Sequence, residues 1–431
     1  MRNTKKIAMY FWMIALVLVV TEVLSFATMS IIKKEFYTYS DFADTKFSRL
    51  EMEKEENYTL RTQNSRRALH PYLGYVLESD DRSIEDGADR IDMAALGFIF
   101  DSGEMVLNPN DNEVVVAIFG GSVAEMFSRV SGSGIDILTS HLRSIPHYSD
   151  KEFTFVLHAM GGYKQPQQLL ALSYFLSLGA VYDIIINIDG FNEIVLPQTE
   201  NVPKGVDPFY PRGWYFLSEK EIQMPFQELI AQISILKRNR ATLAQQFNRV
   251  PIRYSYFLTL LWHTRDHFIA NDLTSLRIQL GDMHSSTQLK YSVSGPERIY
   301  EHDADLIFAL SAEWQRSSLQ MHRLSTANDI RYYHFLQPNQ YVKGSKQHSM
   351  EEAKMDGKYK KHVEVGYPIL REAGETLVRS GVHFKDMTMV FSDYPENIYI
   401  DDCCHFSPKG NTLLGDAIGR FISEDLRRSE L

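Results

Sequence analysis

Short apolar runs of strand length alternate with stretches of helical spacing over much of this chain. Residues 114–118 form a β-branched run typical of a strand buried on both faces of a parallel sheet. Residues 153–157 and 182–188 are two further runs of this kind, and residues 169–178 between them have helical spacing. Strand character returns at residues 330–336. This alternation predicts a parallel, doubly wound α/β sheet.

Residues 196–326, between the third and fourth runs, follow a different pattern. Helix-breaking residues mark an irregular segment near its start: Pro203, Pro208, Pro211 and Gly213. Helical stretches follow Pro225. We interpret this part as a helical insertion or cap within a sheet domain that spans residues 111–425. Near the C-terminus, residues 412–422 have the amphipathic spacing of a closing helix.

Residues 7–32 are apolar except for Glu22 and small polar residues. A bilayer-spanning helix needs about 20 apolar residues, so this segment is long enough to cross a membrane. We interpret it as an uncleaved signal anchor. The alternative is a cleaved signal peptide, in which an apolar region of roughly 7–15 residues is usual. Glu22 is interpreted as tolerated or paired in a dimer, with a functional intramembrane carboxylate as the alternative.

Basic residues on either side of this segment bear on its orientation. Three precede it and two follow it, which slightly favours a cytoplasmic N-terminus at residues 1–6. Residues 33–110 would then form a stalk and N-terminal extension, with a helical stalk over residues 40–68. The sheet domain is expected outside the cytoplasm, on the periplasmic side of a bacterial inner membrane or at the cell surface.

The composition excludes some classes of protein. The chain has 431 residues, 44% hydrophobic and 12% aromatic, which is typical of a globular protein. Its formal charge of −10, without a basic stripe, argues against a nucleic-acid partner. The two cysteines, Cys403 and Cys404, are adjacent and cannot build a conventional disulfide framework. The sequence leaves the oligomeric state open.

The first candidate for chemistry follows the strand at residues 114–118. Gly120 and Gly121 allow a tight turn there, and Ser122 stands where helical spacing begins. Ligands bind at the carboxyl edge of such sheets, and a helix N-terminus favours a developing negative charge. Ser122 is therefore the candidate nucleophile.

A second stretch offers the base. Ser407 suits a helix N-cap and Pro408 suits the first helical position, so His405 is expected on the loop just before the last helix. Asp402, three residues earlier, can accept a hydrogen bond from the imidazole and fix its tautomer, as in a hydrolytic triad. Asp401 is the alternative partner; we prefer Asp402 for its spacing.

Acyl transfer through a serine also needs donors aimed at the tetrahedral oxyanion. Gly162 follows the second predicted strand, and Asn192 follows the third within Gly190-Phe191-Asn192-Glu193. The backbone N–H groups of Ser122 and Gly162 and the side-chain amide of Asn192 could therefore form an oxyanion hole.

These four blocks, in this order, resemble the SGNH, or GDSL-like, hydrolase superfamily, whose four named residues map to Ser122, Gly162, Asn192 and His405. The chain departs from the family pattern twice, with Gly-Gly-Ser for Gly-Asp-Ser and Gly-x-Asn-Glu for Gly-x-Asn-Asp. The resemblance covers roughly residues 111–195 and 328–425. It implies a flavodoxin-like three-layer α/β/α sandwich and serine-ester chemistry without a metal or organic cofactor. Membrane-anchored bacterial relatives suggest an acylated carbohydrate of the cell envelope or an exported polysaccharide as the substrate.

Other interpretations stay open at this point. Gly120-x-Ser122-x-Ala124 also approximates the nucleophile elbow of α/β-hydrolases. Cys403, Cys404 and His405 could suggest zinc, although adjacent cysteines are not the usual ligand spacing. Three polar residues past the fourth strand could line a substrate rim or only cap that strand: Gln337, Asn339 and Gln340.

Two functions are consistent with these residues. The first is a membrane-anchored serine esterase or O-acyltransferase that acts on an acylated carbohydrate. The second is a non-catalytic, carbohydrate-binding scaffold of an envelope polysaccharide assembly. Because a scaffold has no chemical need for a serine, a base and an oxyanion hole together, the sequence favours the enzyme.

Overall fold

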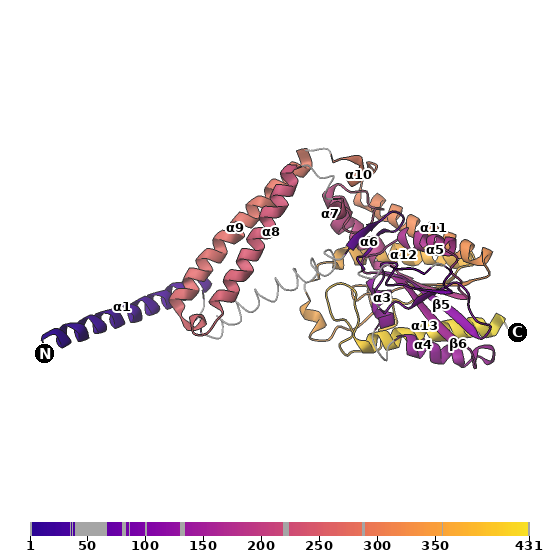
Figure 1. Cartoon of the computed structure of the whole chain (residues 1–431), viewed down its shortest axis with the longest axis horizontal. Helices are drawn as coiled ribbons and strands as arrows, with labels where there is room; N and C mark the ends of the chain where they lie inside the picture. Colours follow the sequence, from indigo (N-terminus) through magenta and orange to yellow (C-terminus); the bar gives the residue numbers. More distant parts are fainter. Residues whose placement is uncertain are drawn as a thin grey trace. The chain divides into compact units, whose positions relative to one another are not determined.

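The computed structural model (Figure 1) describes residues 2–34, 36, 38, 67–79, 83–85, 87–99, 101–129, 134–218, 224–286, 289–355 and 357–429. The chain divides into two compact units. The first comprises Met1–Ser65 and Glu219–Leu289, and the second comprises Arg66–Ser218 and Lys290–Leu431. The predicted stalk at residues 40–68 lies outside the described residues except for its last two, which belong to a strand of the second unit.

The second unit is built on a five-stranded sheet in the order β6-β5-β7-β8-β9, with every neighbouring pair parallel. Its strands are β5 (Glu113–Gly120), β6 (Glu152–Ala159), β7 (Ile184–Asp189), β8 (Arg331–Leu336) and β9 (His383–Asp386). In chain order this is the 2-1-3-4-5 arrangement of flavodoxin-like folds. The predicted α/β class and parallel sheet are therefore confirmed.

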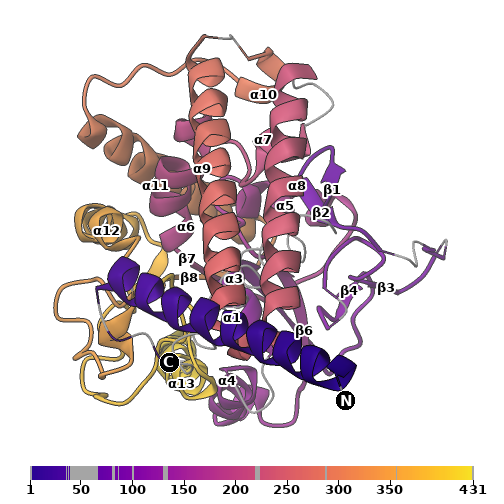
Figure 2. The same cartoon turned by 90° about the vertical axis from the view of Figure 1, so that its left-hand side faces the viewer.

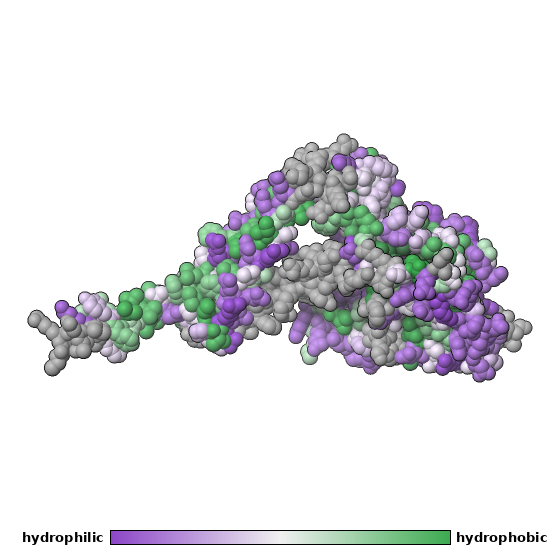
Figure 3. Space-filling view, in the orientation of Figure 1, coloured by the Kyte–Doolittle hydropathy of each residue, from purple (hydrophilic) through white to green (hydrophobic). Residues whose placement is uncertain are grey.

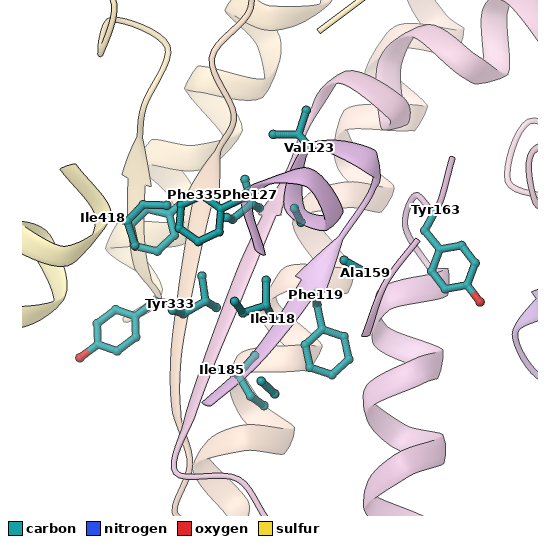
Figure 4. Close-up of a cluster of buried hydrophobic side chains, with 14 of the residues drawn as sticks. Ile118, Phe119, Val123, Phe127, Ala159, Tyr163, Ile185, Tyr333, Phe335 and Ile418 are labelled. Carbon is teal, nitrogen blue, oxygen red and sulfur yellow. The ribbon is translucent and has the colours of Figure 1, made fainter. Parts of the chain in front are cut away.

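Helices cover both faces of the sheet (Figure 1). On one face lie α3 (Ser122–Arg129), α4 (Gly134–Arg143) and α13 (Pro408–Ser429); on the other lie α5 (Gln167–Ser177), α11 (Asp303–Ala327) and α12 (Lys360–Arg379). Figure 4 shows Phe127, Phe335 and Ile418 clustered in the core of the first face. Trp314 packs edge-on against Phe384 on the second face. Because both faces are covered, every residue of β5 and β7 is buried, as the continuous apolar runs predict.

The sequence pattern does not reveal β9. Its four residues, His-Phe-Lys-Asp, include one buried apolar side chain, Phe384, and an exposed lysine. As the last strand of the order, β9 pairs on one side only, so its composition carries little hydrophobic signal.

Smaller elements complete this unit. Two antiparallel pairs precede the sheet: β1 (Arg67–His70) with β2 (Gly74–Leu77), and β3 (Arg90–Asp92) with β4 (Glu104–Val106). Short helices are α6 (Phe191–Leu196), α7 (Trp214–Leu217) and α10 (Tyr291–Ser294). Single turns of 3₁₀-helix occur at Pro146–Tyr148, Val202–Lys204 and Glu352–Lys354, and a π-helical turn occurs at Pro197–Asn201.

The described part of the first unit consists of long helices (Figure 2): α1 (Arg2–Lys33), α8 (Met224–Phe247) and α9 (Tyr256–Ser286), with a short turn at Ile252–Tyr254. Within α1, Met9–Lys33 is long and apolar enough to cross a membrane, with a mean hydropathy of 2.2. The structure thus divides the predicted insertion. Its ends stay with the sheet, whereas α8 and α9 join the N-terminal helix.

Candidate active site

Ser122 and His405 meet at the carboxyl edge of the sheet. Ser122 begins α3 directly after β5, and His405 lies on the loop before α13. The His405 Nε2 atom lies 2.7 Å from the Ser122 Oγ atom, although the two residues are 283 positions apart. The imidazole is 19% exposed, so the pair is in contact with solvent. The geometry suits proton transfer from the hydroxyl to the ring.

The acidic partner of His405 is Asp401, not the predicted Asp402. The Asp401 Oδ2 atom contacts His405 Nδ1. The other oxygen of this carboxylate accepts backbone N–H bonds from Cys403 at 2.9 Å and Cys404 at 3.0 Å. The loop therefore turns around the Asp401 carboxylate and brings the ring of the fourth following residue onto it.

The Asp402 carboxylate is held elsewhere. It accepts hydrogen bonds from the Tyr341 hydroxyl, from the Gly357 N–H at 2.8 Å and from the Lys358 N–H at 2.9 Å. The three-residue spacing favours Asp402. However, the tight turn sends neighbouring side chains in different directions and places the Asp401 carboxylate, not that of Asp402, against the imidazole.

The surroundings keep Asp401 ionised. Burial raises the pKa of this carboxyl, but the hydrogen bond and charge of His405 and the backbone N–H groups outweigh burial and lower the pKa below its usual value. An ionised Asp401 accepts a hydrogen bond from the Nδ1–H of His405, which leaves the unprotonated Nε2 able to accept the Ser122 proton.

The predicted oxyanion donors lie at three neighbouring strand ends, because Gly120 of β5 is in register with Ala159 of β6 and Ile188 of β7. Asn192 Nδ2 donates to the Tyr163 carbonyl at 2.7 Å, which leaves its second hydrogen for a ligand. Within the described parts of the chain, the Gly162 N–H donates no hydrogen bond, whereas the Gly161 N–H donates to Glu125 Oε2 at 2.8 Å.

Both departures from the family pattern have a local explanation. A Cβ atom on Gly121 would lie 2.2 Å from Asn192 Nδ2, so the missing side chain lets the amide approach the serine turn. Glu193, in place of aspartate, accepts N–H bonds from Gly190 at 2.8 Å and from Gln165 at 3.0 Å. The longer side chain thereby ties the turn after β6 to the N-terminus of α6.

Two residues that the sequence does not point to hold the Gly161–Gly162 peptide in place. The Gly161 carbonyl accepts a hydrogen bond from Arg67 Nη2 at 2.8 Å and another from the Tyr75 hydroxyl at 3.0 Å. The Arg67 guanidinium also lies over the Tyr75 ring, 4.3 Å from its centroid. These residues come from β1 and β2, outside the region of family resemblance, and no motif in the sequence points to them.

The predicted substrate-rim residues do not line a rim. Gln337, Asn339 and Gln340 are 2%, 0% and 3% exposed. Asn339 Nδ2 donates to the Cys403 carbonyl at 2.9 Å, and Gln340 Nε2 donates to the Asp401 carbonyl at 2.8 Å. The amides therefore hold the loop that carries Asp401 and His405. Their polarity serves this buried contact, which the sequence pattern could not distinguish from substrate binding.

A buried ion pair supports the same loop. Lys346 Nζ lies 2.8 Å from Glu352 Oε2, and both side chains are fully buried. The other oxygen of Glu352 accepts the N–H groups of Ile398 and Tyr399, each at 2.9 Å. Tyr399 in turn forms a β-bridge with Phe406, next to the histidine.

Two other clusters resemble reactive sites. Cys403, Cys404 and His405 offer ligand atoms within 4.8 Å of one another, but both ring nitrogens of His405 already face Ser122 and Asp401. These residues therefore fit a triad better than a zinc site. His334 lies between Asp189 and Ser318 at 2.8 and 2.7 Å, but the three residues are at most 2% exposed. Burial closes that cluster to substrate.

Comparison with known proteins gives distant likenesses. No protein-family model matches the chain, and neither does a curated protein. Among solved structures, it is similar to an acetylxylan esterase of Geobacillus stearothermophilus, at 9% identity and a TM-score of 0.33, over 72% of this chain and 94% of that chain. It is also similar to a GDSL-like lipase of Bacteroides thetaiotaomicron, at 8% identity and a TM-score of 0.33, over 74% of this chain and 91% of that chain. The strand order, rather than these likenesses, assigns the fold.

Proposed function

We propose that this protein is a membrane-anchored serine esterase or O-acyltransferase. The observation that carries the proposal is the 2.7 Å contact of Ser122 Oγ with His405 Nε2, backed by the contact of His405 Nδ1 with Asp401. A serine hydroxyl in contact with a base, which is itself in contact with an ionised carboxylate, is the arrangement that serine-mediated acyl transfer uses.

In the proposed mechanism, His405 Nε2 takes the hydroxyl proton of Ser122 while Oγ attacks the carbonyl carbon of the ester. The N–H groups of Ser122 and Gly162 and the amide of Asn192 receive the oxyanion of the tetrahedral intermediate. When the intermediate collapses, His405 returns the proton to the departing alcohol, and the acyl group stays on Ser122. Water or a sugar hydroxyl then attacks the acyl-enzyme, with His405 again as the base. Water completes hydrolysis, and a sugar hydroxyl completes transfer.

The substrate proposed for this site is an acylated carbohydrate of the cell envelope or an exported polysaccharide. The family resemblance suggests the ester chemistry. The apolar helix Met9–Lys33 supports a location at the membrane. The basic residues before this helix favour an extracytoplasmic site, where such polysaccharides are exposed.

The test measures p-nitrophenyl acetate turnover by the full chain in detergent, together with labelling of Ser122 by a serine-directed phosphonate. Ser122→Ala and His405→Ala should both lose turnover, and Ser122→Ala should lose labelling. Ser128→Ala is the matched control, because the Ser128 hydroxyl lies on the same helix and, among the described residues, donates only to the Ala124 carbonyl at 2.8 Å. Unchanged turnover in Ser122→Ala would refute the serine mechanism.

The scaffold hypothesis predicts a different result. A folded wild-type protein that binds acetylated glycan, but that neither turns over esters nor reacts with the phosphonate, would be a non-catalytic component. Phosphonate labelling without turnover of the test ester would instead indicate an active serine with another acyl donor.

A further inference from the structure

The carboxylate of Glu22, within the apolar helix α1, binds the N-terminus of α9. One Glu22 oxygen accepts the N–H of Tyr256 at 2.6 Å and that of Phe257 at 3.3 Å, and the other accepts the Ser255 hydroxyl. Tyr256 is the first residue of α9, where backbone N–H groups lack partners within the helix and the dipole is positive. Glu22 therefore caps a helix that lies far away in the sequence.

Packing extends this contact toward the end of α1. Met29 is fully buried, with Tyr256 and Leu260 packed against it. The Phe26 ring lies edge-on to the Tyr256 ring at 5.0 Å. The first turns of α9 are thus seated along the second half of α1.

The position of Glu22 places this contact well inside the apolar helix. Glu22 precedes Lys33 by eleven residues, which is about 16 Å of helix at the usual rise of 1.5 Å per residue. The hydrocarbon core of a bilayer is about 30 Å thick. If Lys33 stands at the membrane surface, the start of α9 lies below that surface.

The chemistry of the neighbouring residues suits such a position. We call residues 241–262, which comprise the end of α8, the connecting turn and the start of α9, the hairpin tip. Its charged residues are Arg249 and Arg253. Apolar side chains point outward from it: Val250 is 66% exposed, Phe257 39% and Leu261 46%. Figure 3 shows hydrophobic residues along α1 and where the long helices meet it.

Beyond the hairpin tip, α8 and α9 carry charged residues again, and the first of these on α8 lies beside one on α9. Arg240 of α8 and Asp266 of α9 form an ion pair, with Nε 2.6 Å from Oδ1. This pair bounds the tip on the side away from α1. Because the helical backbone on both sides of the tip satisfies most of its own hydrogen bonds, the tip can enter an apolar medium.

We propose that the hairpin tip is a second membrane element, inserted into the same leaflet as the second half of α1. Val250, Phe257 and Leu261 contact the acyl chains, and Arg253 keeps its guanidinium over the Tyr254 ring, 4.6 Å from the centroid. Glu22 sets the depth of the tip, because its carboxylate in the bilayer is satisfied by the N-terminus of α9. The inference rests on the proposed membrane anchor.

The experiment measures how deeply single residues lie in the bilayer. A fluorophore is attached to single cysteines introduced into the full chain, in which Cys403→Ser and Cys404→Ser remove the native thiols. Labels stand at Leu18→Cys on α1, at Val250→Cys and Phe257→Cys on the tip, and at Phe268→Cys and Ile278→Cys farther along α9. The protein is placed in phosphatidylcholine–phosphatidylglycerol vesicles that carry doxyl-labelled lipids, with iodide as the aqueous quencher. Ile278, which is 59% exposed, serves as the matched control.

We expect doxyl quenching at Leu18, Val250 and Phe257, and iodide quenching at Ile278. Phe268 should lie up to about 16 Å farther toward water than Phe257, because eleven residues of helix separate them. In Glu22→Leu, doxyl quenching at Phe257 should fall to the level of Ile278 while that at Leu18 persists.

Three outcomes would overturn the inference. Iodide quenching at Val250 and Phe257 with doxyl quenching at Leu18 would place the tip in water and leave the anchor intact. Protection from both quenchers, with cross-links between copies, would make a second copy of the chain the partner of the tip. Loss of doxyl quenching at Leu18 would remove the membrane anchor itself. Ester turnover in the same preparation reports the proposed catalytic function separately.

Discussion

The carbonyl oxygen of Gly161 accepts a hydrogen bond from Nη2 of Arg67 at 2.8 Å. This carbonyl and the Gly162 N–H belong to one planar trans peptide, in which the two groups point in opposite directions. Arg67 therefore fixes the direction of the proposed oxyanion donor, and its positive charge polarises that donor.

Arg67→Met should lower kcat about 10-fold with little change in KM, because the loss of a charge-assisted hydrogen bond of about 1.5–3 kcal/mol falls partly on the transition state. Steady-state kinetics on a soluble ester check this positioning role. Arg67→Lys keeps a cationic donor and should recover part of kcat. Tyr75→Phe removes a neutral donor and should lower kcat less than Arg67→Met does. A lower melting temperature with unchanged kcat would show that Arg67 only supports the fold.

Asp401→Asn should reduce kcat by about 10,000-fold, because an amide no longer selects the His405 tautomer whose Nε2 can take the serine proton. Asp402→Asn should keep most of kcat and lose thermal stability, since its carboxylate holds the Gly357 and Lys358 N–H groups. Comparison of kcat/KM and melting temperature separates the two carboxylates. A deeper loss of kcat in Asp402→Asn would reverse the assignment.

Gly121→Ala should lower kcat about 100- to 1,000-fold, as for the loss of one oxyanion donor, because the new Cβ displaces the Asn192 amide. The closest clash is with the end of the Asn192 side chain, and the Tyr163 carbonyl, 3.2 Å from the new Cβ, has to move by only a few tenths of an ångström, so the fold should persist. Asn192→Ala should show a similar loss, and the double variant should be no slower than Asn192→Ala alone. Additive losses would mean that Gly121 acts independently of Asn192.

Asn339→Ala should destabilise the protein by about 1–3 kcal/mol, because the Cys403 carbonyl loses its donor in a buried site. kcat should fall as the loop with Asp401 and His405 loosens. Asn328→Ala, which removes an exposed hydrogen bond to the Leu324 carbonyl, is the control and should change stability by less than about 0.5 kcal/mol. A raised KM with unchanged unfolding free energy would restore the substrate-rim interpretation.

Acid should reduce the contribution of the Lys346–Glu352 ion pair to the stability of the fold. Burial raises the pKa of Glu352, but Lys346 and backbone N–H groups outweigh it and hold the pKa below the usual 4.5. A lowered folded-state pKa adds stability above about pH 4.5, and this stability is lost as the pH falls through the folded-state value. Urea unfolding from pH 6 to 3 should therefore be less pH-dependent in Glu352→Gln than in the wild type. Equal slopes would exclude Glu352 as a contributor.

The sequence by itself determined the elements that depend on neighbouring residues. The apolar runs at β5, β6, β7 and β8 predicted the parallel sheet, because strands buried on both faces need continuous hydrophobic residues. The glycine turn before Ser122 and the cap before α13 placed the serine and His405 at strand and helix ends. Each of these signals is local, so a single sequence carries it.

Only the tertiary structure decided contacts that depend on the direction of a turn or on distant segments. Asp401 and Asp402 are adjacent and chemically equal, and the path of the loop alone selects one of them for His405. The same holds for buried Asn339 and Gln340, for Arg67 of β1, and for Glu22 at the start of α9. A polar residue has the same identity whether it meets solvent, substrate or a backbone carbonyl, and burial is set by the whole fold.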